Sequence, residues 1–228
     1  MTLLLAVAGF APPAHADQWR DKQWYLEFLN AAQAHKITKG SGVTVAVVDT
    51  GVDGTHPDLK GNVLRGTDDA AGDGWRDTDG HGTGIASLIA GHGHGPGGRD
   101  GILGLAPEAK ILPISGDSQR GLAKSTLKKA SVVNLSLKRG GLALLADDAL
   151  DADMVVVAAA GNTTQDADRV IPPANHPGVI AVSGLDENGE FAKESVQGPE
   201  VVLSAPAVNI AVASAGKREH VPSRVELG

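Results

Sequence analysis

Short runs of apolar residues alternate along this chain with stretches in which apolar positions recur at helical spacing. The apolar runs are rich in small and β-branched residues, and the most continuous of them, at 43–48, is typical of a strand buried on both sides of a sheet. They are residues 43–48, 109–113, 132–137, 154–159, 179–182 and 201–203. Helices are predicted at 24–35, 82–90 and 122–130. This alternation predicts an α/β fold with a mostly parallel central sheet and helices on both faces.

Three polar residues come at or just after the carboxyl ends of predicted strands: Asp49, Ser136 and Asn162. In parallel sheets these ends meet at one edge, where ligands bind. We therefore expect the functional site at this edge.

Composition and charge narrow the classes of partner. At 228 residues the chain is long enough for one domain with a sizeable core. Aromatic residues make up only 3% and the net charge is −7, so neither base stacking nor phosphate binding is favoured and nucleic acid is not an expected partner. The absence of cysteine excludes disulfides, thiolate metal sites and a cysteine nucleophile.

The N-terminus has the pattern of an export signal. Residues 3–10 form a short apolar stretch, and Ala14-His15-Ala16 fits a signal-peptidase site, so residues 1–16 are predicted to be a signal peptide and 17–228 a single exported domain. No Lys or Arg precedes the apolar stretch, which suggests a signal incomplete at its start; an irregular N-terminus is the alternative. No other apolar run approaches the 18 residues of a membrane span.

Two glycine-flanked polar residues suggest acid–base chemistry. Asp49 ends a buried strand and Gly51 allows the chain to turn away, whereas His81 stands between Gly80 and Gly82, which leave its ring accessible. A carboxylate that orients an imidazole is the arrangement a general base needs. Asp49-Thr50-Gly51 is also the aspartic-protease triplet, but that mechanism needs two such aspartates, and a homodimer would have to supply the second.

A third candidate lies at the end of the strand predicted at 154–159. The chain passes through Ala160 and Gly161 and stops at Asn162, whose amide could donate a hydrogen bond to a developing oxyanion. An Asn after Gly is also common in ordinary turns.

Together these segments resemble the subtilisin-like serine protease (subtilase) family. Within that family the chain is similar to actinobacterial mycosins, proteases associated with type VII secretion. The matching motifs are Asp49-Thr50-Gly51 with His56-Pro57-Asp58-Leu59, Asp79-Gly80-His81-Gly82-Thr83, Val133-Asn134-Leu135-Ser136-Leu137, Ala159-Ala160-Gly161-Asn162, Asn175-His176-Pro177-Gly178 and Leu203-Ser204-Ala205-Pro206.

The resemblance implies a secreted or cell-surface serine endopeptidase that needs no cofactor and acts on extended peptides or proteins. Asp49 would orient His81, His81 would act as general base and acid, and Asn162 would donate to the oxyanion. It also implies a set of substrate-binding residues: Ser136, Leu137, Ala160 and Gly161. The oligomeric state is left open.

The sequence departs from the family where the nucleophile should stand. No Gly-Thr-Ser-x-Ala turn occurs, and neither Ser214 nor Ser223 has the small-residue turn that exposes a nucleophile. The interval between His81 and Asn162 is short, and Lys138-Arg139 replaces the glycine after the substrate strand. We therefore expect a domain incomplete at its C-terminus, with uncovered sheet surface, an unassigned nucleophile and severely impaired hydrolysis. The alternative is a non-catalytic pseudoprotease that binds extended peptides.

Two weaker candidates concern metals. Asp58 resembles a calcium ligand of some subtilases, but no loop that would complete the oxygen cage is recognisable, so no metal is expected. Residues 91–98, with His92 and His94 among glycines, are predicted to be a mobile surface loop.

Overall fold

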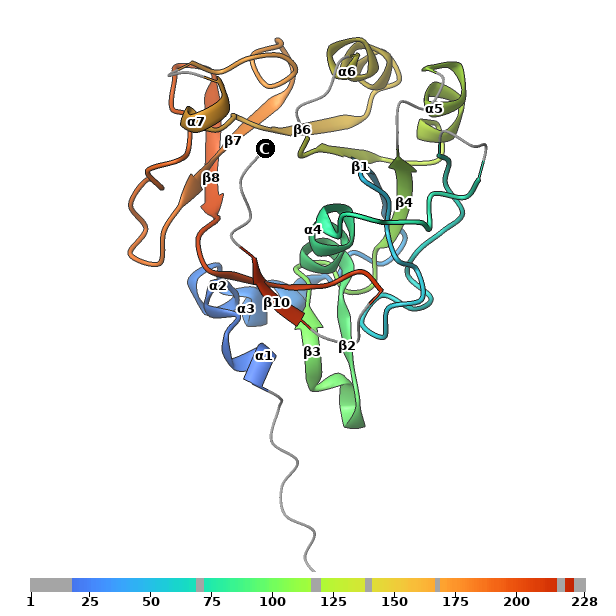
Figure 1. The fold of residues 1–228 in the computed structure, drawn as a ribbon, viewed down its shortest axis with the longest axis vertical. Helices are drawn as coiled ribbons and strands as arrows, with labels where there is room; N and C mark the ends of the chain where they lie inside the picture. Colours follow the sequence, from blue (N-terminus) through green and yellow to red (C-terminus); the bar gives the residue numbers. More distant parts are fainter. Residues whose placement is uncertain are drawn as a thin grey trace, which may run out of the picture.

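The central feature of the structure is a six-stranded parallel sheet with strand order β4-β1-β5-β6-β7-β8 (Figure 1). The computed structural model describes residues 18–68, 72–115, 120–137, 141–166, 169–216 and 220–223; the side chains of 120–122, 165–166 and 220–223 are not described. The strands are β1 (Thr44–Asp49), β4 (Lys110–Ser115), β5 (Val132–Leu135), β6 (Val155–Ala159), β7 (Ile180–Leu185) and β8 (Val201–Pro206). Each contains most of a predicted apolar run, so the predicted sheet is confirmed.

The two faces of the sheet are covered by different helices. Along β1, Val45 and Val47 belong to the core cluster that contains Ala86 and Ala90 of α4 (His81–Ala90). The alternate residues of β1 belong to a second cluster, which includes residues of α5 (Arg120–Leu127) and α6 (Leu142–Leu150). Figure 1 shows α4 on one side of the sheet and α5 and α6 on the other. Helices on both faces are thus confirmed, although α6 was not predicted.

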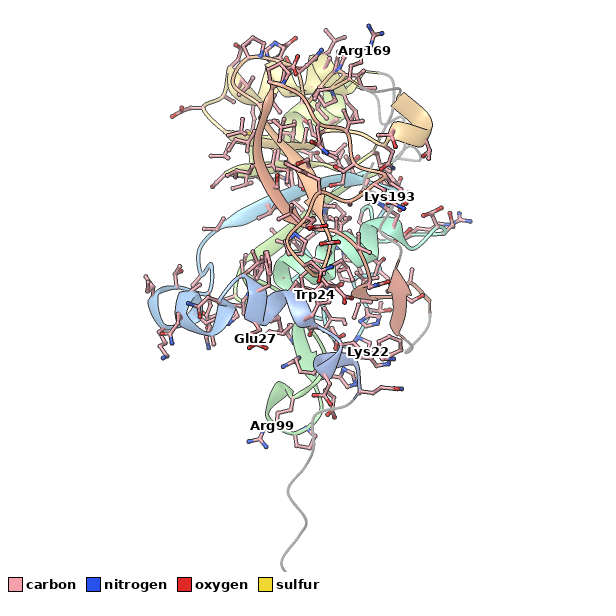
Figure 2. The ribbon with its side chains drawn as sticks, turned by 90° about the vertical axis from the view of Figure 1, so that its left-hand side faces the viewer. Lys22, Trp24, Glu27, Arg99, Arg169 and Lys193 are labelled. Carbon is pink, nitrogen blue, oxygen red and sulfur yellow. The ribbon has the colours of Figure 1, made fainter. Side chains whose placement is uncertain are left out.

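The prediction of one continuous helix at 24–35 is wrong. The segment forms α2 (Trp24–Phe28) and α3 (Ala31–Ile37), preceded by a short α1 (Gln18–Asp21). Asn30 adopts a left-handed conformation at φ 52°, which interrupts the right-handed helical backbone between α2 and α3. Trp24, labelled in Figure 2, donates through Nε1 to the carbonyl of Val208 at 3.3 Å, so these helices pack against the C-terminal part of the chain.

Two antiparallel pairs lie outside the central sheet. The first pairs β2 (His92–His94) with β3 (Asp100–Leu103) around the short helix η1 (Pro96–Gly98), and Figure 2 shows Arg99 at its far end. The second pairs β9 (Ile210–Ala213) with β10 (His220–Ser223). The prediction of a mobile loop at 91–98 is therefore wrong, because His92 and His94 lie in a paired strand.

The edge strand β8 leaves apolar side chains in solvent. Val202 is 60% exposed and Leu203 57% exposed, at the place where the register between β7 and β8 shifts. β8 therefore leaves apolar surface uncovered at this point, in agreement with the uncovered sheet surface expected from the sequence. The short helix α7 (Thr163–Asp166) follows β6.

Candidate active site

Asp49 is the last residue of β1 and is almost completely buried, with 1% of its surface exposed. The backbone N–H of Thr50 donates to its Oδ1 at 2.8 Å. The chain then turns at Gly51, where φ is +119° and a Cβ atom would lie 2.2 Å from the carbonyl oxygen of Arg76. Glycine is required here because both the left-handed conformation and the close approach exclude a side chain.

His81 is the first residue of α4, and its ring faces the Asp49 carboxylate. Nδ1 lies 2.8 Å from Oδ1 and 3.0 Å from Oδ2. Because an ionised carboxylate can only accept, Nδ1 carries the hydrogen and donates it. In the neutral ring Nε2 is then the basic nitrogen, which is the tautomer that a general base needs.

The electrostatics of His81 favour its charged form. Burial by itself lowers the pKa of His81, but the hydrogen bond to Asp49 and the negative charges of Asp49, Asp79 and Asp77 outweigh it, and the pKa is raised above its usual value. The site therefore stabilises the imidazolium that proton abstraction would generate.

The close packing of β1 against α4 depends on Gly82. A Cβ atom at Gly82 would lie 2.1 Å from the carbonyl oxygen of Gly51 and 3.0 Å from Oδ1 of Asp49. Any larger residue would push the helix, and with it His81, away from the carboxylate.

The other predicted site residues lie at the same edge of the sheet. The parallel register pairs Val48 with Leu135, and Leu135 with Ala158. Asp49, Ser136 and the segment that leads to Asn162 therefore leave neighbouring strands at about the same level, as the sequence predicted.

The segment after β6 is held firmly. Ala160 donates through its N–H to the carbonyl of Val182 at 2.8 Å, and the N–H of Val196 donates to the carbonyl of Gly161 at 2.9 Å. Asn162 is 2% exposed and forms an isolated antiparallel bridge with Ser195. The oxyanion candidate thus sits on a fixed backbone.

The predicted substrate strand continues from β5 into two half-buried residues, Ser136 and Leu137. Asn134 donates through Nδ2 to Oγ of Ser136 at 2.8 Å, which fixes that hydroxyl. Lys138 and Arg139, the departure noted in the sequence, lie outside the described residues.

No nucleophile is found beside His81 within the described part of the chain. Among these residues the His81 ring forms hydrogen bonds to the Asp49 carboxylate and none to a hydroxyl group, and Ser214, half-buried after β9, makes no bond to it. The Ser223 side chain lies outside the described residues. The nucleophile remains unassigned.

A second buried carboxylate, Asp58, has a histidine partner that the sequence did not reveal. Asp58 is fully buried; its Oδ1 accepts from Nδ1 of His94 at 2.6 Å, and its Oδ2 accepts from the N–H of Ile102 at 2.8 Å. Both carboxylate oxygens of Asp58 therefore already accept a hydrogen bond from the protein. Among the described residues no group of three or more His, Cys, Asp or Glu could hold a metal ion.

Comparison with known proteins identifies what the chain is similar to. The model of the subtilase family matches residues 40–225. A thermostable alkaline protease of Halalkalibacterium halodurans is 34% identical over 211 residues, which cover 86% of this chain and 56% of that protein. Mycosin-1 of Mycobacterium tuberculosis is 32% identical over 251 residues, which cover 84% of this chain and 55% of that protein. The chain thus spans about half the length of these curated relatives.

A solved structure agrees with the fold. The crystal structure of MycP1 from Mycobacterium smegmatis matches with a TM-score of 0.70 at 26% identity, over 92% of this chain and 72% of that chain. The similarity confirms the predicted subtilisin-like fold and the likeness to mycosins. In the part of the chain that the structure describes, no helix is long and apolar enough to cross a membrane.

Proposed function

Since the chain belongs to the subtilase family, we propose that Asp49, His81 and Asn162 are the acid, base and oxyanion parts of a serine endopeptidase site for extended peptides. The observation that carries the proposal is the 2.8 Å contact between His81 Nδ1 and the buried Asp49 carboxylate at the carboxyl edge of the sheet. With one aspartate in this arrangement and a histidine as its partner, an aspartic-protease mechanism is not favoured.

Each residue has a distinct role in this proposal. Nε2 of His81 would take the proton of a nucleophile hydroxyl and return it to the leaving amine, while Asp49 stabilises the imidazolium. Asn162 would donate to the oxyanion, a contribution typically worth about 10²–10³ in rate. Ser136 and Leu137, with Ala160 and Gly161, would bind the extended backbone of the substrate.

We further propose that hydrolysis by this chain is severely impaired. The support is the missing Ser motif in the sequence and the His81 ring, which contacts no hydroxyl among the described residues. The remaining oxyanion and substrate-binding groups would leave a rate about 10³–10⁴-fold above that in water. A non-catalytic protein that binds extended peptides is the second candidate, favoured by the same observation.

Export is also part of the proposal. Residues 1–16 lie outside the described residues, and the support for a signal peptide is the apolar stretch followed by Ala14-His15-Ala16. Fusion of residues 1–30 to a periplasmic reporter enzyme tests it, with removal of residues 3–10 as the control. Reporter activity in both fusions, or in neither, would contradict export through this segment.

The main test is labelling with a fluorophosphonate probe, followed by intact mass and peptide mapping. We expect no adduct on a protein that unfolds cooperatively in urea, together with binding of an extended peptide without turnover. An adduct at Ser214 or Ser223 that disappears in His81→Gln would contradict the proposed impairment. Absence of both labelling and peptide binding would contradict the peptide site itself.

A further inference from the structure

The first turn of α4 carries His81, and its free backbone N–H groups need partners. A helix start leaves four such groups, here those of Gly80, His81, Gly82 and Thr83. The N-cap residue Gly80 has no side chain with which to serve them. The partners that do so therefore decide where the helix starts and where His81 is held.

Asp77 serves two of the four groups with its two carboxylate oxygens. Oδ1 accepts from the N–H of Gly80 at 2.8 Å, and Oδ2 accepts from the N–H of Thr83 at 2.9 Å. Oδ2 also accepts from the hydroxyl of Thr83 at 2.5 Å. This negative charge lies at the positive end of the helix dipole, where it is stabilising.

The same carboxylate reaches the turn that follows Asp49. The hydroxyl of Thr50 lies 2.9 Å from Oδ1 of Asp77, its nearer acceptor, and 3.3 Å from Oδ1 of Asp49, and the N–H of Gly82 donates to the Thr50 oxygen at 3.0 Å. Asp77 therefore orients the group that serves a third N–H of the helix. That group belongs to the neighbour of Asp49.

A second link runs through Thr83. Its oxygen accepts from the N–H of Asp53 at 2.9 Å while its hydroxyl hydrogen points to Asp77. Two hydroxyl groups thus link the Asp77 carboxylate to both sides of the turn after β1. Thr50 connects it to the N–H of Gly82 in the first turn of α4, and Thr83, in that same turn, connects it to the N–H of Asp53.

We propose that Asp77 is a positioning residue that fixes the first turn of α4 against the turn after β1 and so holds the His81 ring on the Asp49 carboxylate. The proposal deepens the proposed function, because it rests on His81 being the general base. Asp77 makes no contact with the His81 ring and acts through Thr50, Thr83 and the helix start.

The chemistry of the position requires a carboxylate. Every group that contacts it is a donor: the N–H groups of Asp79, Gly80 and Thr83 and the hydroxyls of Thr50 and Thr83. Asparagine would replace one of the two carboxylate oxygens with an NH₂ group, which cannot accept a hydrogen bond. The donors on that side would lose their partner. Asp77→Asn is therefore a nearly isosteric change with a strong expected effect.

Asp79 offers a matched control. It also raises the pKa of His81 by its charge, but its only helix contact is Oδ1 with the N–H of His81 at 3.2 Å. Asp79→Asn removes the same unit of charge near His81 and leaves the Asp77 network in place. The pair of variants separates charge from positioning.

The experiment is proton NMR of the full chain with imidazole-¹⁵N histidine. The Nδ1–H of His81, bonded to Asp49, should give a downfield resonance, assigned by its loss in His81→Gln. We expect Asp79→Asn to keep the resonance and to lower the pKa of His81, and Asp77→Asn to lose the resonance and to lower the pKa further. Retention of the resonance in Asp77→Asn, with a pKa equal to that of Asp79→Asn, would overturn the proposal.

Two pairs of variants, at Thr50 and at Thr83, keep the test decisive if Asp77→Asn does not fold. Thr50→Val and Thr83→Val each remove one of these hydroxyl links, and Thr50→Ser and Thr83→Ser restore the hydroxyls. We expect the valine variants to weaken or broaden the downfield resonance and the serine variants to keep it; equal spectra for valine and serine would overturn the proposal. The readout needs no hydrolysis, so failure of the proposed function would appear in the probe and peptide assays while these spectra remained as expected.

Discussion

Among the histidine–aspartate pairs in the described part of the chain, His81–Asp49 and His94–Asp58 have nearly the same local geometry and very different surroundings. In each, an imidazole Nδ1 contacts a fully buried carboxylate, at 2.8 Å for His81–Asp49 and at 2.6 Å for His94–Asp58. In each, a glycine is packed against that carboxylate. A Cβ atom on Gly82 would lie 3.0 Å from Asp49 Oδ1, and a Cβ atom on Gly101 would lie 2.2 Å from Asp58 Oδ1.

The difference lies in which elements each pair connects. The first joins the carboxyl end of β1 to the first residue of α4, beside the ends of β5 and β6. The second joins the segment after β1 to β2, a strand paired only with β3 among the described residues. The bond alone therefore does not distinguish the two pairs; the first pair lies at the carboxyl edge of the sheet beside the proposed oxyanion and substrate-binding groups, and the second does not.

Among the substitutions that test this comparison, Gly101→Ala is expected to change the free energy of unfolding most. Gly101 has φ +72°, and the new methyl group would strike the Asp58 carboxylate, so the substitution combines backbone strain with displacement of a buried pair. We expect a loss of about 3–4 kcal/mol in the free energy of unfolding, measured with urea. The matched control is Gly61→Ala, at φ +91° with nothing within 4 Å of the new Cβ, where only about 1 kcal/mol should be lost. Equal losses would show that the Asp58 pair contributes nothing beyond backbone conformation.

Removal of one carboxylate charge from each pair should have unequal effects. His94 and Ile102 donate to different oxygens of the fully buried Asp58, so Asp58→Asn leaves an NH₂ group facing one of these two donors, and we expect a loss of about 2–3 kcal/mol. Asp49 lies at the open edge of the sheet, beside His81, which has 22% of its side chain exposed. We therefore expect Asp49→Asn to lower the free energy of unfolding by about 1 kcal/mol.

The comparison of the two aspartate variants has a clear contrary outcome. If Asp49→Asn destabilises the protein as much as Asp58→Asn, the first pair is as structural as the second. Peptide binding, measured on the same variants, separates the pairs further, since only the Asp49 pair lies beside the proposed peptide site.

The two pairs also show how far sequence analysis reached. Asp49 and His81 were predicted together because each stands in a local pattern with chemical meaning: an acid at a strand end, and a histidine between glycines at a helix start. Asp58 and His94 are held together by an antiparallel hairpin within a glycine-rich segment, where no periodic pattern indicates strands, and the pairing was missed for that reason.

Similar reasons explain the other agreements and misses. The strands of the central sheet follow continuous apolar runs, which fix their position well. The break at Asn30 depends on one left-handed residue, and α6 was missed although Leu142 and Leu145 recur at helical spacing. The role of Asp77 depends on donors from Thr50, Gly80 and Thr83, which come together only in three dimensions.

The smallest expected effect is the pH dependence of the His81 contribution to stability. The folded-state pKa of His81 is raised because the Asp49 hydrogen bond and nearby negative charges outweigh the opposing effect of burial. Folding therefore favours the protonated ring, and this contribution is fully present below the unfolded-state pKa and is lost as pH rises through the folded-state pKa. We expect His81→Gln to reduce the free energy of unfolding more at about pH 5.5 than at about pH 8.5. In the Asp79→Asn background this difference should shrink, since one of the charges that raise the pKa is gone; a larger loss at the higher pH would mean that the Asp49 pair favours the neutral ring.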